Sequence, residues 1–369
     1  MTKSQDEKYA WVALYLVSGL GNTGFLNLLN RIGEPSVVLD TGFSELVNLG
    51  GIRKDAAKRI VKKEFIADPE EEMAKAEKLN ARIITYSDPS YPEFLKQIHY
   101  PPMLFYLKGK DFPANKMFIA VVGSRNATHY GLNAAKVIGI GLAKRGIGVV
   151  SGLAKGIDSA AHTGCLKGKG FTIAVMGTGI DAIYPAANRS LSEQIIENGA
   201  LISEFPIGTS PEPRNFPIRN RIISGLSRGV VVVEATKKSG SLITASYALD
   251  QGREIFAVPG SINSFKSRGS HSLIKKGAKL VENAEDILSE FFFDAGNRHA
   301  GDHIKTTSDT PPDMDILERK VYDILGDYPI HIDQIVRTAD MDPGEVLSIL
   351  MKMELKEIIR QMPGKMFLR

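Results

Sequence analysis

Residues 214–245, RNFPIRNRIISGLSRGVVVVEATKKSGSLITA, are the stretch from which the fold of this 369-residue chain is best predicted. The stretch opens with basic and aromatic residues, which are followed by an apolar run of helical composition. GVVVVEA at 229–235 is a short β-branched run of the kind that is buried in a parallel sheet. A turn rich in serine and glycine follows at 237–241, and residues 242–251 again have helical composition. The stretch therefore predicts a helix, a strand and a second helix.

The turn at 237–241 is suited to an anion. A turn between the end of a strand and the start of a helix exposes backbone N–H groups in the positive half of the helix dipole, which favours phosphate. Basic groups surround an aromatic ring ahead of the apolar helical run that leads to the strand, at Arg214, Phe216, Arg219 and Arg221. Single-stranded nucleic acid needs charge for its phosphates and a ring for stacking, at roughly 1 to 3 kcal/mol per base. We predict such a site here, with a solvated basic surface as the alternative.

Strand-like runs alternate with helical stretches around this segment. Five further apolar or β-branched runs lie between residues 118 and 260, and most of them end in a Gly or Ser turn: FIAVVGS, IGVVSG, FTIAVMG, ALISEF and EIFAVPG. Such alternation predicts an α/β fold with a doubly wound parallel sheet and with ligands at the carboxyl ends of the strands. A short strand, KLV at 279–281, is expected to close the edge.

The loops after these strands offer candidate ligand groups. In the loop at 123–126, Gly lets the backbone approach a ligand, Ser offers a hydroxyl and Arg can form a bidentate fork on phosphate. The loop lacks the GxGxxG dinucleotide fingerprint. In the loop at 151–158, Asp158 is expected to be the N-cap of the next helix. The loop at 177–189, which contains Tyr184, is interpreted mainly as a structural turn.

Residues 1–80 are helical in pattern and are predicted to form a SAM-like or helix-hairpin-helix-like domain. Two glycine-rich turns, at 19–24 and 49–52, resemble the hairpin whose backbone N–H groups touch a DNA phosphate. The segment has no net positive charge, so a helical bundle that uses glycine only for tight turns is an equal alternative.

The sheet domain with an N-terminal extension is predicted at 81–293. Within it, SYPEFL and YPPMLFYLKG, at 90–109, are expected to be a connector because prolines punctuate them. A polar segment at 294–313 predicts a linker, and residues 314–369 predict three helices and a terminal strand pair, a winged-helix-like domain.

Positive charge is concentrated in the middle of the chain. Residues 1–113 carry 15 basic and 15 acidic groups, whereas residues 114–293 carry 21 and 13, a net charge of +8. Residues 313–369 carry 8 basic and 11 acidic groups, a net charge of −3. This distribution favours a polyanionic ligand on the middle domain and argues against nucleic-acid binding by the C-terminal segment.

Several classes of protein are disfavoured by composition and motifs. No apolar run approaches the roughly 20 residues that span a bilayer, so we expect a cytoplasmic protein with no membrane partner. The single cysteine, Cys165, rules out an intrachain disulfide and a cysteine-rich metal site. Only His299 and His303 approach metal-ligand spacing, in the linker, so we expect no metal and no cofactor. A Walker A motif, a nucleophile elbow and an HExxH motif are all absent from the sequence.

Residues 85–290 resemble the DNA processing protein A (DprA/Smf) family. The resemblance rests on motifs in order and with natural spacing, among them VVGSR (121–125), SGLAKGID (151–158), NFPIRNRIISGLS (215–227), KSGSLITA (238–245) and GREIFAVPGSI (252–262). It implies a Rossmann-like DNA-binding domain with no established enzymatic activity. Members of the family bind incoming single-stranded DNA during natural transformation, protect it and load the RecA recombinase onto it, working as homodimers.

The resemblance also implies a set of DNA-binding residues, each carried over onto a matching position. They form the single-strand pocket: Gly123, Ser124, Arg125, Arg214, Phe216, Arg219, Asn220, Arg221, Lys238, Ser239, Gly240 and Ser241. The sequence departs from the family pattern at Ser270-His271, near the expected dimer edge at 271–282.

A nucleotide-handling enzyme of a related Rossmann family is the alternative function, for example a nucleoside monophosphate phosphoribohydrolase. Glu204 or Glu234, each at a strand end, would then act on the N-glycosidic bond. Such enzymes use a PGGxGT-like loop, where this chain has Lys238-Ser-Gly-Ser.

Overall fold

The structure, a computed structural model, describes residues 3–49, 51–113, 116–292, 314–326, 330–356, 358–362 and 364–368. The chain divides into two compact units, Met1–Ala127 with Gly131–Glu290, and Thr128–Tyr130 with Phe291–Arg369. The linker predicted at 294–313, with His299 and His303, lies outside the described residues. Among the helices that are described, none has the length and apolar character needed to cross a membrane.

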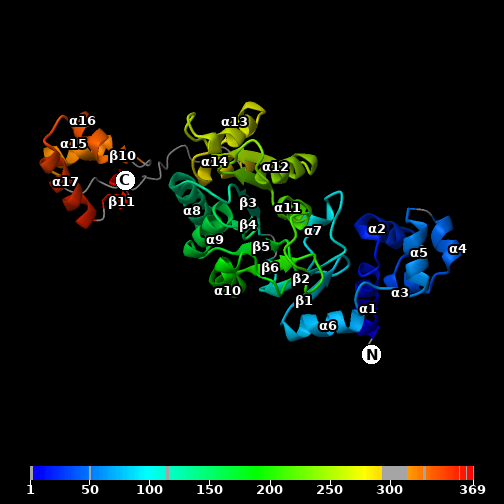
Figure 1. The fold of residues 1–369 in the computed structure, drawn as a ribbon. Helices are drawn as coiled ribbons and strands as arrows, with labels where there is room; N and C mark the ends of the chain where they lie inside the picture. The colour runs from blue at the N-terminus through cyan, green and yellow to red at the C-terminus, as the bar shows by residue number, and fades with distance from the viewer. Residues whose placement is uncertain are drawn as a thin grey trace. The chain divides into compact units, whose positions relative to one another are not determined.

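A nine-stranded sheet forms the centre of the first unit (Figure 1). Its strands pair in the order β1-β2-β6-β5-β4-β3-β7-β8-β9, and every pairing from β6 to β9 is parallel. The parallel strands are β3 (Phe118–Val122), β4 (Gly148–Ser151), β5 (Thr172–Met176), β6 (Ala200–Ser203), β7 (Gly229–Val232), β8 (Glu254–Ala257) and β9 (Lys279–Leu280). The six strands predicted between residues 118 and 260, and the edge strand near 280, are confirmed.

Two antiparallel strands extend the sheet beyond β6, and one of them corrects a prediction. They are β1 (Arg82–Thr85) and β2 (Leu104–Gly109). The second lies within the run expected to be a connector, so that interpretation was wrong for residues 104–109. Pro101 and Pro102 precede the strand rather than interrupt it, and they leave its N–H groups free to pair with β6.

Helices cover both faces of the sheet. Ile222 and Ile223 of one helix pack in the same apolar cluster as Val122 and Val175, whereas Ile195 of another packs with Ala174 in a second cluster. The helices of this part are α8 (His129–Lys144), α9 (Ile157–Lys167), α10 (Arg189–Asn198), α11 (Asn215–Gly225), α12 (Ser241–Asp250), α13 (Arg268–Lys275) and α14 (Ala284–Phe292), with short 3-10 turns at Ala186–Asn188 and Phe265–Ser267. The predicted doubly wound α/β fold is confirmed.

The order in which the chain adds strands to the sheet reverses at β3. From β3 the chain passes through β4, β5 and β6 on one side, and then crosses to β7 on the other side of β3 and continues to β8. In open α/β sheets, ligands bind in the crevice at such a switch point, outside the carboxyl ends of the strands. The topology therefore directs attention to the loops after β3, β4, β5 and β7.

Six helices precede the sheet and belong to the same compact unit. They are α1 (Lys3–Tyr15), α2 (Gly21–Ile32), α3 (Pro35–Asp40), α4 (Phe43–Asn48), α5 (Lys54–Val61) and α6 (Pro69–Lys78), and the short α7 (Glu93–Lys96) follows β1. Helix α1 has two apolar sides: Trp11 and Leu14 pack with the small helices, and Val12, with Leu16 just after the helix, packs with Tyr106 of β2. The domain boundary near residue 80 stays a prediction.

In the described residues from 314 onwards, the second unit has three helices and a small sheet around their own core. Val321, Ile335, Leu350 and Phe367 are fully or almost fully buried together. Its elements are α15 (Ile316–Ile324), α16 (Ile332–Ala339), α17 (Pro343–Leu355), β10 (Ile330–His331), β11 (Arg360–Met362) and β12 (Met366–Leu368), with strand order β10-β12-β11. This is the predicted winged-helix arrangement.

Candidate functional site

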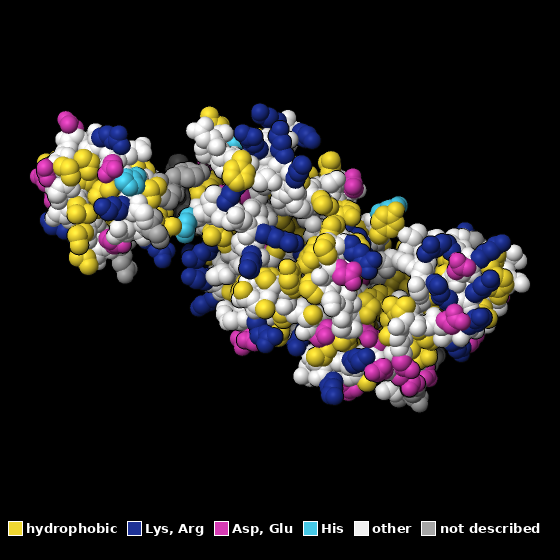
Figure 2. Space-filling view, in the orientation of Figure 1, with side chains coloured by type: hydrophobic (Ala, Val, Ile, Leu, Met, Phe, Trp, Pro, Cys, Tyr) yellow, Lys and Arg dark blue, Asp and Glu magenta, His cyan; other side chains and the backbone are white. Residues whose placement is uncertain are grey.

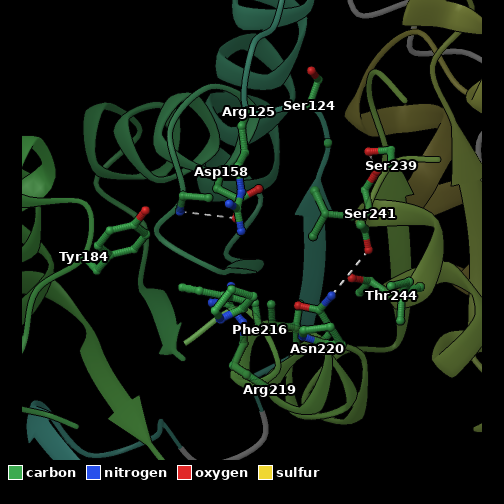
Figure 3. A pocket seen from close by; sticks show the side chains of 18 of the residues that line it. Ser124, Arg125, Asp158, Tyr184, Phe216, Arg219, Asn220, Ser239, Ser241 and Thr244 are labelled. Carbon is green, nitrogen blue, oxygen red and sulfur yellow. Dashed lines mark hydrogen bonds between the residues drawn. The ribbon is translucent and has the colours of Figure 1, made fainter. Parts of the chain in front are cut away.

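A cavity of about 500 Å³ lies at the switch point, at the carboxyl end of β3 (Figure 3). Its walls come from the loops after β3, β4, β5 and β7, from the segment before α11, and from α11 and α12. The lining residues are Val122, Gly123, Ser124, Arg125, Ala154, Asp158, Tyr184, Pro211, Pro213, Phe216, Pro217, Arg219, Asn220, Ile223, Thr236, Ser239, Gly240, Ser241, Ile243 and Thr244.

One wall of the cavity combines a helix start with hydroxyl groups. Helix α12 begins at Ser241 after Gly240, and the hydroxyls of Ser239 and Ser241 lie 2.8 Å apart. The Asn220 side-chain amide donates to the Gly240 carbonyl at 3.4 Å and so ties the turn to α11. Because the positive end of the α12 dipole and several hydroxyls meet here, the wall favours phosphate.

Arg125 brings an exposed positive charge to the same cavity. It follows β3, its side chain is exposed, and it reaches down between the walls (Figure 3). The loop before it is held by a bond from the Asn126 N–H to the Ser124 hydroxyl at 3.2 Å. A guanidinium in this position can form two parallel hydrogen bonds to a phosphate group.

The opposite wall is aromatic. The ring of Phe216 is half-buried, and its centroid lies 5.0 Å from the Arg125 guanidinium carbon and 5.7 Å from the Tyr184 ring. Gly177 makes room for this ring, since a Cβ there would lie 2.8 Å from its Cδ1 atom. The cavity therefore combines an anion-binding wall with a pair of aromatic rings.

Arg219 lies beneath the cavity rather than on its rim. It is 3% exposed and donates to the Gly152 carbonyl at 2.7 Å and to the Val175 carbonyl. Burial lowers the pKa of Arg219 to about 10, with Asp158 opposing the shift, so the group stays cationic at neutral pH. A Cβ at Gly152 would lie 2.5 Å from its Nη1 atom, so a larger residue there would push the guanidinium out of this position. Arg219 joins the ends of β4 and β5 and places a fixed positive charge under the site.

Asp158 corrects a prediction about helix α9. The helix begins at Ile157 with Gly156 in the cap position, so Asp158 is not its N-cap. Its carboxylate instead turns back and accepts from the backbone N–H groups of Gly152 and Ala154, at 3.1 and 3.4 Å. Burial raises the pKa of this carboxyl, and Arg219 opposes the rise. Asp158 thus shapes the loop after β4.

Arg221 does not line the cavity. It is 6% exposed, and its guanidinium binds both carboxylate oxygens of Glu204, at 2.7 and 2.5 Å, and the Tyr100 carbonyl at 2.9 Å. Glu204 also accepts from the Asn22 amide at 2.7 Å. Arg221 comes two residues after Arg219 in the same helix, so it points to a different side of that helix. It therefore forms a structural ion pair and does not take the predicted position in the pocket.

Arg214 and Lys238 are neighbours of cavity-lining residues in the sequence, but they do not line the cavity themselves. Both side chains are exposed, and Arg214 pairs with Glu212 at 2.7 Å. The structure brings together the other nine predicted residues: Gly123, Ser124, Arg125, Phe216, Arg219, Asn220, Ser239, Gly240 and Ser241.

Sequence reasoning missed Tyr184, Thr244 and three prolines of the lining. The loop with Tyr184 was interpreted as a structural turn because its glycines and proline are typical of one. The position of Tyr184 was the signal that could have identified it. It follows a predicted parallel strand, and the loops at the carboxyl ends of such strands lie around the ligand crevice.

Neither carboxylate of the enzymatic alternative reaches the cavity. Glu204 is held by Arg221. Glu234 is 3% exposed and packs against Gly131, where an added Cβ would lie only 2.6 Å from the Glu234 Cδ atom. Among the described residues, no group of three or more His, Cys, Asp or Glu side chains could hold a metal ion.

Two family models match the chain. Residues 82–292 match DNA recombination-mediator protein A, and residues 305–365 match the DprA winged helix domain. Protein Smf of Synechocystis is 32% identical over 99% of this chain and 100% of its own length. DNA processing protein DprA of Streptococcus pneumoniae is 40% identical over 75% of this chain and 95% of its own length.

Solved structures agree with these matches. The X-ray structure of DprA from Streptococcus pneumoniae has a TM-score of 0.68 at 37% identity, covering 76% of this chain and 97% of the other. A structure of DNA processing protein A from Helicobacter pylori, concerned with its single-stranded DNA binding mode, has a TM-score of 0.52 at 27% identity, covering 58% and 96%. On these matches the chain belongs to the DNA recombination-mediator protein A family, the DprA/Smf family.

Proposed function

We propose that the cavity at the switch point binds single-stranded DNA and that the chain acts as a single-strand-binding recombination mediator. The observation that carries the proposal is the convergence of the α12 turn, Arg125 and two aromatic rings on one cavity. Phosphate and a base face are the two groups that every nucleotide of a single strand offers.

The aromatic wall favours single strands over duplex. A ring stacks only on a base whose face is free, and in a duplex that face is covered by the neighbouring base pairs. The Helicobacter pylori relative, whose structure concerns single-stranded DNA binding, supports single strands as the ligand.

Charge around the sheet supports a long polyanionic ligand. Lys and Arg side chains gather over α13 (Figure 2), where Arg268, Lys275 and Lys276 are exposed. Together with the net charge of +8 over residues 114–293, this surface attracts phosphates beyond those inside the cavity.

The finer role follows from family membership and belongs to the same proposal. It comprises protection of incoming DNA, loading of the RecA recombinase during natural transformation, and work as a homodimer with its edge at 271–282. We propose no catalytic step, because Glu204 and Glu234 lie outside the cavity. Release of base from nucleoside monophosphates by the purified protein would contradict that part.

Binding of DNA by the cavity is tested with Arg125→Ala in gel shifts over a salt series. The variant should bind single strands more weakly regardless of sequence, with a salt slope shallower by roughly one phosphate contact. Arg31→Ala is the matched control, because Arg31 is also exposed but lies at the end of α2, outside the cavity. If folded Arg125→Ala kept the single-strand affinity and the salt slope of wild type, the proposal that the cavity binds DNA would be contradicted.

A further inference from the structure

We propose that a bound single strand continues out of the cavity along the seam between α8 and α9, where a row of lysines holds its phosphates without touching its bases. The inference rests on the proposed function and extends it to a surface outside the cavity.

The seam begins at the cavity. Ala154, just before α9, and Asp158, in the first turn of α9, both line the cavity, and the Ile157 N–H donates to the Ser124 carbonyl at 3.2 Å. Lys155 follows Ala154 and is exposed. From there α9 runs from the carboxyl end of β4 back toward the start of β5, over about 16 Å. A strand that leaves the cavity beside Ser124 therefore reaches the seam.

Glycines bring the two helices close together. A Cβ on Gly164 of α9 would lie 2.3 Å from the carbonyl oxygen of Lys136 of α8. A Cβ on Gly168, just after α9, would lie 2.6 Å from the Cβ of Ala143 near the end of α8. Because the backbones touch, the side chains on the outer rims of the two helices are drawn together over the seam.

Two lysines meet at this seam. The side-chain nitrogens of Lys136 and Lys167 lie within hydrogen-bonding reach of each other, although both groups are cationic. This contact with Lys167 lowers the pKa of Lys136. No acidic side chain in the described part of the chain forms an ion pair with either ammonium group. The two like charges repel each other, and a phosphate oxygen between them relieves that repulsion.

Further cations continue the row in both directions. Lys155 lies at the cavity end of the seam, and Lys144 and Lys169 lie at its far end; all three are exposed. Figure 2 shows Lys and Arg side chains gathered beside α9. Within these two helices, which the structure describes throughout, the only acid is Asp158, which is buried and turned to the loop after β4. The seam is therefore positive along its whole length.

The chemistry of this surface favours nucleic acid over protein. Protein interfaces centre on aromatic and other apolar side chains. On the described residues of α8 and α9, Val137 is the only large apolar side chain that is exposed. A DNA backbone requires only positive charge, which the lysines supply. Since no exposed Phe, Tyr or Trp ring is available on these helices for stacking, the bases take no part here.

The experiment measures how affinity grows with strand length. The full chain is titrated with oligothymidylates of about 5 and about 20 nucleotides, of which only the longer can occupy both the cavity and the seam. Lys136→Gln/Lys167→Gln should bind the long strand roughly 25-fold more weakly at about 0.1 M salt, because two contacts with a salt slope of about 0.7 each contribute roughly fivefold apiece. Its affinity for the short strand should stay that of wild type.

Two matched variants and one modified strand serve as controls. Lys136→Arg/Lys167→Arg keeps both charges and should bind both strands as wild type does. Lys75→Gln/Lys78→Gln removes two exposed charges from the acidic helix α6 and should change neither affinity. On a long strand that is base-free (abasic) beyond its first few nucleotides, the Lys136→Gln/Lys167→Gln variant should show the same loss, because only phosphates are held.

The inference would be overturned if folded Lys136→Gln/Lys167→Gln kept the long-strand affinity of wild type, which would point to an acidic protein surface as the occupant of the seam. An equal loss on the short strand, in the α6 control or in the Arg variant, or no loss on the abasic strand, would overturn it as well. Wild-type protein that binds neither strand would instead overturn the proposed function. The two failures are distinguishable, because Arg125→Ala should weaken binding to both strands and the lysine variant only to the long one.

Discussion

One buried histidine, His162, is kept neutral by its surroundings. His162 is fully buried, and its Nδ1 lies 2.7 Å from the Thr172 hydroxyl, which donates to the Val149 carbonyl at 2.9 Å. Since the hydroxyl hydrogen is committed to Val149, Nδ1 carries the ring proton and donates to Thr172. Burial, and then Arg219, lower the pKa of His162 to about 3, so the ring is neutral at physiological pH.

This neutral histidine predicts a loss of stability in mild acid. Its folded pKa of about 3 lies below the ordinary 6.5, so the unfolded chain takes up the proton first as pH falls. The stability contribution is complete above pH 6.5 and is lost toward pH 3. Between pH 7.5 and pH 5, urea unfolding of wild type should lose about 2 kcal/mol more than His162→Gln does.

Exposed His99 supplies the control for that measurement. His99→Gln should show the pH response of wild type, because the substitution lies at the surface and leaves His162 and its buried surroundings unchanged. An equal pH response in His162→Gln and wild type would contradict the assignment.

At the scale of elements, α11 connects the cavity to the rest of the unit. Phe216, Arg219 and Asn220 line the cavity, whereas Arg221 turns to Glu204 after β6. Glu204 also binds Asn22 of α2, and its carbonyl accepts from the Tyr15 hydroxyl of α1. One helix therefore shapes the site and secures the N-terminal helices to the sheet.

Arg221→Ala is predicted to destabilise the fold without removing a DNA contact. The substitution leaves the buried Glu204 carboxylate without its guanidinium partner, which typically costs about 3 to 5 kcal/mol. Denaturant unfolding measures this loss, and the salt slope of single-strand binding should stay that of wild type at a temperature where the variant is folded. A shallower slope, as in Arg125→Ala, would place Arg221 on a phosphate after all. Arg221→Met with Glu204→Leu should recover much of the stability, because no buried charge then lacks its partner.

At the scale of the molecule, the two units differ in charge. Residues 114–293 carry +8 and residues 313–369 carry −3. The winged-helix unit also exposes apolar side chains on α17, with Leu347 44%, Met351 59% and Leu355 85% exposed. Acidic charge and apolar surface are more typical of a protein contact than of a DNA groove.

Truncation after Asp313 is therefore predicted to leave single-strand affinity nearly intact. A titration of the shortened and full chains with the same labelled oligonucleotide measures the difference. A tenfold loss, about 1.4 kcal/mol, would show that the winged-helix unit contributes to DNA binding.

Much of the fold was accessible from sequence because its signals are local. The β-branched runs and their glycine turns predicted six parallel strands, and the turn at 237–241 predicted an anion-binding helix start. The strand at 104–109 was not predicted for two reasons. Prolines stand just before it, and one of its two partners, β6, lies about a hundred residues further along the chain.

The sequence by itself determined the residue types of the site, whereas the tertiary structure decided which of them face the cavity. Arg219, Asn220 and Arg221 are consecutive on a helix that is buried on nearly all sides, so no polar stripe marks the ligand side. Packing against the ends of β5 and β6 turned Arg219 under the cavity and Arg221 to Glu204. Tyr184 joined the site only because the strand order sets the loop after β5 beside α11, a long-range arrangement that no local pattern encodes.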